Sequence, residues 1–347
     1  MRVRYAWIFF SDIILIPAVL FCLLNSDLVT YGVRMGKGQL TIVFGARDFE
    51  EVFADPAVGD SIKAKLHLIE EIKQFAYDSI GLKPSDNYTT FFDQKDQRLM
   101  YVVTAAEKYE LKPYMWSFPV LGEVPYKGFF DEHQAKEEYY RLKMLGMDAD
   151  IGGASGWSTL GWFKDPVLSS MLKKNEADLA ELIIHELTHG TLFVRDSVDY
   201  NENLAQFVGV EGAKWFLRSK YGPDSKELNS YLTSMVEEEK KSAFMLKQSK
   251  FLDTIYSSFE PTMSDEDKLF LKRKSFMVIW KRARELKLNS DVTFADRVLR
   301  KIAQSGNTVF LQYSRYEAKQ DDFREEFESC KDDLKLFVQN MVTKYGT

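Results

Sequence analysis

The chain has 347 residues, 46 Lys and Arg, 52 Asp and Glu, a formal net charge of −6 and 45% hydrophobic residues, which is typical of a folded globular protein. This composition excludes a disordered chain and a protein with many membrane spans, and its acidic balance predicts no nucleic-acid partner. The two Cys cannot build a Cys-rich metal site or a disulfide framework, so any metal must be bound by the four His and by carboxylates.

The amino end carries an apolar segment, residues 6–24, that follows Arg2 and Arg4. About twenty apolar residues are enough to cross a bilayer as a helix. Basic residues before such a segment favour a cytoplasmic amino terminus. We therefore expect a membrane anchor over residues 1–26, with residues 27–347 on the extracytoplasmic (periplasmic) side.

Three alternatives to this anchor are a cleaved signal peptide, a lipid attached to Cys22 and a buried amphipathic helix. No A-x-A-like cleavage site follows the apolar segment. Phe21 stands before Cys22, where a lipid-attachment motif has a small residue. The segment also has almost no polar face, so an uncleaved anchor is the preferred interpretation.

The first part of the body, residues 27–173, has mixed α/β patterns. Residues 31–48 carry hydrophobic side chains at every second position, at Leu40, Ile42 and Phe44, which predicts a strand. Residues 60–80 carry an apolar stripe at helical spacing, which predicts an amphipathic helix.

Short strands and hairpins are expected next. β-branched and aromatic residues alternate with Gly and Pro over residues 99–130 and again over residues 149–163. A charged helix that contains His133 is expected to begin near Asp131 between these two stretches.

The second part, residues 174–347, is helical in pattern almost to its end. We therefore expect an α+β fold that is predominantly helical, with a small mixed sheet, in one domain over residues 27–347. Acidic residues flank the charged helices near residues 240–250 and 272–284, and we expect solvated faces there rather than a site for a polyanion.

Residues 185–189 read His-Glu-Leu-Thr-His and form an HExxH motif. An apolar stripe precedes them, Asn175 is a plausible N-cap and Gly190 a plausible stop, so the motif is expected in the last turns of a helix. His185 and His189 are one turn apart and point the same way, so both can bind one tetrahedral Zn²⁺. Glu186 lies about 100° around the helix, where a carboxylate can take a proton from a zinc-bound water. The alternative is a polar helix face with two solvated histidines.

A third ligand must come from elsewhere in the chain. The longer HExxHxxGxxH pattern fails, because Leu192 and Arg195 occupy the positions of its Gly and third His. His67 and His133 are far upstream and would need a long-range arrangement. A downstream carboxylate is the better prospect.

The carboxylate candidates are Asp196, Asp199, Glu202 and Glu211. Residues 201–220 predict a helix with Asn201 as its N-cap, on which Glu202 shares a face with small residues. Such a face lets two helices approach closely, as a short carboxylate needs if it is to reach a metal on the neighbouring helix. Glu211 lies on the opposite side of this helix, and the two aspartates are weaker candidates in the connecting loop.

The HELTH motif followed by Asn201-Glu202-x-x-Ala205 resembles the gluzincin pattern of zinc aminopeptidases. Residues 116–131, 158–169 and 185–205 are similar to a bacterial family of predicted zinc aminopeptidases that carry an amino-terminal membrane or lipoprotein anchor. The resemblance runs from about Tyr31 onward. It implies a zincin-like fold, one Zn²⁺ bound by His185, His189 and Glu202, and Glu186 as the catalytic residue.

Two weaker elements complete the expected site. Residues 156–163 precede the HExxH helix in the order expected for an edge strand beside an extended substrate, although an ordinary hairpin explains them equally well. The similarity to a family segment makes Tyr316 the preferred donor to the developing oxyanion, with Tyr200 and Tyr313 as alternatives.

The sequence thus predicts a zinc-dependent metallopeptidase, and the family resemblance narrows it to an aminopeptidase that acts on peptides. One alternative is a catalytically silent, zinc-stabilised scaffold at the membrane. Another is a zinc hydrolase of a non-peptide amide or ester, because the water chemistry is the same.

Overall fold

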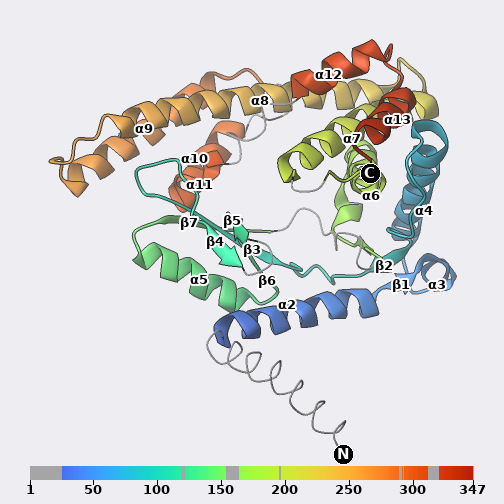
Figure 1. Ribbon diagram of the computed structural model, residues 1–347, viewed down its shortest axis with the longest axis horizontal. Helices are drawn as coiled ribbons and strands as arrows, with labels where there is room; N and C mark the ends of the chain where they lie inside the picture. Colours follow the sequence, from blue (N-terminus) through green and yellow to red (C-terminus); the bar gives the residue numbers. More distant parts are fainter. Residues whose placement is uncertain are drawn as a thin grey trace, which may run out of the picture. The chain divides into compact units, whose positions relative to one another are not determined.

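The structure is a computed structural model that describes residues 26–118, 122–153, 164–194, 197–288, 291, 293–311 and 320–346. The chain divides into two compact units, residues 1–46 and residues 47–347. The apolar segment at residues 6–24, on which the anchor prediction rests, lies outside the described residues. Among the helices of the described part, none is long and apolar enough to cross a membrane. The described part is predominantly helical with small sheets, as predicted (Figure 1).

Within the first unit, the described residues form helix α2 (Ser26–Gly45), and the prediction of a strand at residues 31–48 was wrong except at its last two residues. Leu40, Ile42 and Phe44 would share one face of a strand, but residues two apart in a helix point about 200° apart. Accordingly, Ile42 is buried while Leu40 and Phe44 are exposed. Three residues at period two are too few to distinguish a strand from a helix.

The second unit begins with a short strand and three helical segments. They are β1 (Arg47–Asp48), α3 (Phe49–Ala54), α4 (Asp60–Phe75) and the π-helical turn η1 (Ala76–Ile80). The helix predicted at residues 60–80 is confirmed, with Leu66, Ile69 and Ile72 fully buried on its inner stripe.

The short strands predicted over residues 99–130 are confirmed, and a strand covers the start of the stretch predicted over residues 149–163, of which residues 154–163 lie outside the described residues. Together with strands outside these stretches they form three small sheets. The strands are β2 (Thr90–Phe92), β3 (Tyr101–Ala106), β4 (Trp116–Phe118), β5 (Gly122–Val124), β6 (Lys127–Phe129), β7 (Asp148–Gly153) and β8 (Val167–Leu168). They pair in the orders β1-β2-β8, β6-β3-β7 and β4-β5, and only the β2–β8 pair is parallel. Helix α5 (Glu132–Met144) lies between β6 and β7 in the chain, and Asp131 caps it as expected.

From residue 171 onward the described chain is helical, again as predicted. The segments are η2 (Met171–Lys173), α6 (Glu176–Thr191), α7 (Val198–Tyr221), α8 (Lys226–Ser257), α9 (Asp265–Glu285), α10 (Phe294–Ser305), α11 (Thr308–Leu311), α12 (Gln320–Ser329) and α13 (Leu334–Tyr345). Side chains of α8, α9, α10 and α11 build one hydrophobic cluster around Leu252, Ile279 and Phe310.

A buried polar network joins this helical cluster to the sheet. Lys272 of α9 is 3% exposed and pairs with Asp148 of β7, which also accepts a hydrogen bond of 2.7 Å from the backbone N–H of Asn307. The Asn307 amide donates to the carbonyl of Glu107 and accepts a hydrogen bond of 2.8 Å from Tyr256. Because each buried polar group finds a partner, the network fixes how α9 and α10 sit on the strands.

Candidate metal centre

Helix α6 carries the HExxH motif in its last two turns. The Asn175 side chain caps the helix as predicted, accepting a hydrogen bond of 2.9 Å from the N–H of Asp178. Leu179, Ile183 and Leu187 form its buried stripe. Gly190 is not the stop that the sequence predicted, because α6 continues to Thr191.

Helix α7 begins at Val198, so Asn201 lies in its first turn and the prediction of Asn201 as N-cap was wrong. Its amide instead bonds the loop between the two helices, donating to the carbonyl of Val194 and accepting from its N–H, both at 2.8 Å. Asn201 is 2% exposed. This pair of hydrogen bonds fixes the short connection between α6 and α7.

The two helices approach closely through small residues, and this prediction is confirmed. A Cβ atom at Gly209 would lie 2.9 Å from the carbonyl oxygen of Glu181 and 3.2 Å from the Cβ of His185. A Cβ atom at Gly212 would lie 2.9 Å from a methyl group of Ile184. At Gly209 the obstructing atom belongs to the backbone, so only glycine permits the observed separation of α6 and α7 there, whereas at Gly212 an added Cβ would have to displace the side chain of Ile184.

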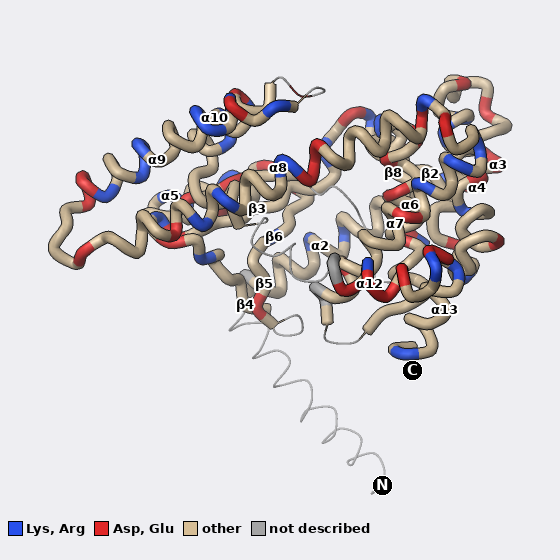
Figure 2. Tube along the Cα trace, turned by 90° about the horizontal axis from the view of Figure 1, so that it is seen from above, with Lys and Arg blue, Asp and Glu red and all other residues tan. Residues whose placement is uncertain are grey.

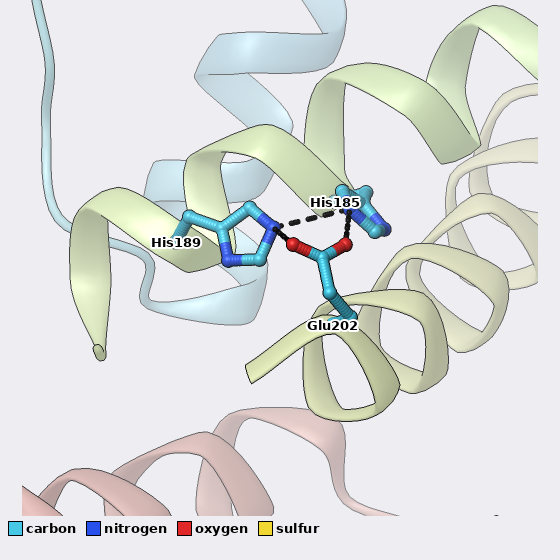
Figure 3. Close-up of side chains that lie close together, drawn as sticks. All are labelled: His185, His189 and Glu202. Carbon is cyan, nitrogen blue, oxygen red and sulfur yellow. Dashed lines mark hydrogen bonds and ion pairs between the residues drawn. The ribbon is translucent and has the colours of Figure 1, made fainter. Parts of the chain in front are cut away.

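This close approach brings the side chains of His185, His189 and Glu202 together (Figure 3). The two histidine Nε2 atoms are 3.2 Å apart. The Glu202 oxygens lie 3.6 Å from Nε2 of His185 and 3.5 Å from Nε2 of His189. One ligand atom from each residue can be chosen so that all three lie within 4.8 Å of one another.

These distances and donor types fit a zinc ion. Ligand atoms placed tetrahedrally at about 2.0–2.1 Å from zinc are separated by about 3.3 Å. The two histidine nitrogens lie close to that separation, and each of them lies 3.5 to 3.6 Å from a different oxygen of Glu202. Two imidazoles and one carboxylate are also the protein ligands of a catalytic zinc site that keeps one position open. The Glu202 side chain is 54% exposed, so the cluster has a solvent-facing side.

The charges at the cluster also suit metal binding. Interaction with His185, and next with His189, holds the pKa of Glu202 well below its usual range, and burial opposes this only in part. Glu202 is therefore ionised at neutral pH, as a metal ligand must be.

Glu186 follows His185 on α6 and is half-buried, and its carboxyl group interacts electrostatically with His185, His189 and Glu202. Burial raises the pKa of its carboxyl group, while electrostatic interaction with His185 and His189 acts in the opposite direction. A carboxylate that lies beside a metal site without being one of its ligands can serve as a general base.

Two residues that sequence reasoning missed surround Glu186. The hydroxyl of Tyr88 interacts with the Glu186 carboxylate, and burial, followed by the charge of Glu186, raises the pKa of Tyr88 well above its usual value. Asp165 is 1% exposed, and its carbonyl accepts a hydrogen bond of 2.7 Å from the N–H of Tyr88. Tyr88 also has a φ of +58°, a conformation that tyrosine rarely adopts. No motif marks either residue; only the fold places them beside Glu186.

The other two histidines lie elsewhere. His67 on α4 stacks on Phe53 at 3.9 Å between ring centroids, and its side chain is 62% exposed. His133 on α5 is exposed beside Glu137. A site with three histidines, which the sequence left open, is not formed by them.

The remaining acidic candidates divide into two groups. Glu211 has a side chain only 11% exposed that forms ion pairs with Lys214 and Arg324, so it is a structural charge. Asp196 lies outside the described residues, and the side chain of Asp199 is not described.

Of the expected oxyanion donors, only Tyr200 is described. Its ring packs on Phe323 and Tyr345, and its hydroxyl points to Met341, so it faces the carboxyl-terminal helices. Tyr313, Tyr316 and the substrate strand expected at residues 156–163 lie outside the described residues.

A family model described as "Putative aminopeptidase" matches residues 30–344, which is most of the chain. None of the curated proteins and none of the solved structures matches it.

Proposed function

We propose that this chain, which belongs to the family described as "Putative aminopeptidase", is a zinc-dependent aminopeptidase. The observation that supports zinc dependence best is the convergence of His185, His189 and Glu202 at separations that suit one tetrahedral ion. Membership in this family supports the hydrolysis of peptides as the reaction. The cluster and Glu186 offer the metal ligands and the general base that this reaction needs.

In this proposal His185 and His189 hold the ion from α6 and Glu202 holds it from α7. A bound Zn²⁺ would supply a Lewis acid that polarises the substrate carbonyl and lowers the pKa of water. Glu186 accepts the proton of the attacking water and returns it to the departing amine. Tyr88 keeps its own proton because its pKa is raised, so its hydroxyl donates to Glu186 and helps to orient it.

Replacement of the base tests the mechanism. We expect the isosteric Glu186→Gln variant to fold and bind zinc as the wild type does but to lose hydrolysis by a factor of about 10² to 10⁴, the usual contribution of a general base. Zinc content and melting temperature measured beside activity keep the result interpretable. Unchanged hydrolysis would refute the role of Glu186. A protein that binds zinc and hydrolyses neither peptides nor other amides and esters would instead be the zinc-stabilised scaffold.

The aminopeptidase assignment has a separate test. Aminoacyl amides and the same compounds with a blocked amino terminus are compared as substrates. We expect hydrolysis only of the compounds with a free amino group. Equal hydrolysis of both sets would leave a metallopeptidase without amino-terminal specificity.

We also propose that residues 6–24 anchor the chain in a membrane with its body on the extracytoplasmic side, as the sequence pattern favours. We expect activity from a reporter enzyme that is fused to the carboxyl end and that works only outside the cytoplasm. Release of the protein into the soluble fraction without detergent would contradict the anchor.

A further inference from the structure

One side of α9 exposes basic and large apolar residues along its length, and we call these residues the α9 outer face. They recur at intervals of three and four positions and therefore lie on one side of the helix. All are exposed: Phe270, Arg273, Lys274, Met277, Lys281 and Arg284.

The rotation of α9 about its own axis is fixed by its other side. Ile279 and Ala283 are buried in the hydrophobic cluster, and Lys272 is buried against Asp148. The outer face therefore cannot turn inward without breaking both the core and an ion pair.

This part of the chain is strongly basic although the protein as a whole is acidic. Residues 268–304 contain eleven Lys and Arg but only three Asp and Glu, against a net charge of −6 for the chain. Figure 2 shows these basic positions along α9 and α10. The acidic residues of α9 lie in its first turn, at residues 265–267, and at Glu285. The sequence pattern favoured a solvated face here, but no acidic residue of α9 lies on the outer face from Arg273 to Arg284.

The basic residues of the outer face are available for a partner. Among the described residues, Arg273, Lys274 and Lys281 form no ion pair with an acidic side chain, whereas Lys241 and Arg297 nearby share Asp291. Unpaired positive charges that stand close together repel one another, and an anionic partner would relieve this repulsion.

Two large apolar side chains lie within the same face. Phe270 is 64% exposed and precedes the basic residues, and Met277, two helical turns further on, is 44% exposed and lies between Lys274 and Lys281. A nucleic-acid backbone would pair with the charges but would leave these side chains in water. An anionic bilayer accepts both, because the charges meet the headgroups while the apolar side chains enter the boundary of the acyl chains.

We propose that the α9 outer face binds the surface of an anionic phospholipid bilayer. This interaction does not require the metal centre, since α9 contributes none of the residues of the cluster. A membrane anchor at residues 6–24, which the sequence predicts, would bring the chain to a bilayer.

The test uses the full-length protein reconstituted into vesicles of phosphatidylcholine alone or with phosphatidylglycerol. A water-soluble amine reagent labels exposed lysines, and mass spectrometry gives the rate at each site. We expect labelling of Lys274 and Lys281 to slow by about fivefold in the anionic vesicles, since each basic residue at such a surface gains about 1 kcal/mol. Lys240 and Lys247, exposed on α8, are internal references that should change little.

Two further measurements decide the nature of the contact. Salt at about 0.5 M is expected to restore the labelling rates, because it screens surface charges within a few ångströms. A double variant, Phe270→Ser with Met277→Ser, keeps every charge and is expected to lose most of the protection. Equal rates in both kinds of vesicle would overturn the proposal. Protection that survives the double variant, or that an oligonucleotide provides without anionic lipid, would assign the face to a polyanion instead.

Discussion

The close approach of α6 and α7 at Gly209 gives a direct test of how the metal centre is built. In the Gly209→Ala variant the added Cβ lies 2.9 Å from the Glu181 carbonyl oxygen, whereas an ordinary contact begins at 3.4 Å. The helices must therefore separate by about 0.5 Å, more than the tolerance of about 0.2 Å for metal–ligand distances. Overpacking costs about 1–3 kcal/mol, and the higher helix propensity of Ala returns up to about 1 kcal/mol.

We therefore expect Gly209→Ala to lower the free energy of unfolding of the metal-free protein by up to about 2 kcal/mol and to weaken zinc binding by at least about tenfold. Urea unfolding in a chelator and competition titration with a zinc indicator measure these two quantities. Gly190→Ala is the matched control, because that glycine also lies in α6 but has nothing within 4 Å of its added Cβ. It should be neutral or slightly stabilising. A Gly209→Ala protein that is as stable as this control and binds zinc as the wild type does would refute the reasoning.

Three other predictions follow from the same structure. Glu202→Ala should lose bound zinc while Glu211→Ala keeps it, as metal analysis of the purified variants will show; loss only in the second variant would mean that the wrong carboxylate was chosen. Burial lowers the pKa of Lys73 to about 8 from 10.5. Between these two pH values the unfolded chain therefore binds one proton more than the folded chain. The free energy of unfolding, measured with urea at a series of pH values, should rise there by about 3 kcal/mol relative to Lys73→Met. The same pH dependence in both proteins would contradict this. Gly306 has a φ of +59°, and a Cβ there would overlap the Asp148 carboxylate. Gly306→Ala should therefore cost about 3 kcal/mol or more, measured by thermal unfolding, and a melting temperature equal to that of the wild type would contradict the overlap.

The parts of the site that could be predicted from sequence depend on local geometry. The spacing of His185 and His189 fixes their common direction on a helix whatever surrounds it. The small residues on the Glu202 side of α7 indicated which carboxylate can approach α6. Both inferences need only helical periodicity and the size of side chains.

The parts that could not be predicted depend on contacts between distant segments. Tyr88 reaches Glu186 from a loop almost one hundred residues upstream, where it keeps an unfavourable φ because neighbouring segments hold the loop. Asn201 looked like a helix cap from its residue type, but its amide is used by the backbone of Val194. Strand and helix were confused at Leu40 to Phe44, because so short a pattern does not define a period.

Helix packing accounts for the convergence of the three candidate ligands. His185, His189 and Glu202 converge because Gly209 and Gly212 let the helices meet, and the stripe that positions α6 is buried against other helices. In a small zinc domain, by contrast, the unfolded chain gains its structure only when the metal binds. A site that forms before the ion arrives spends little of the binding free energy on ordering the chain. Because the chain offers three ligands, an ion bound there would keep a fourth position for the water that the proposed hydrolysis requires.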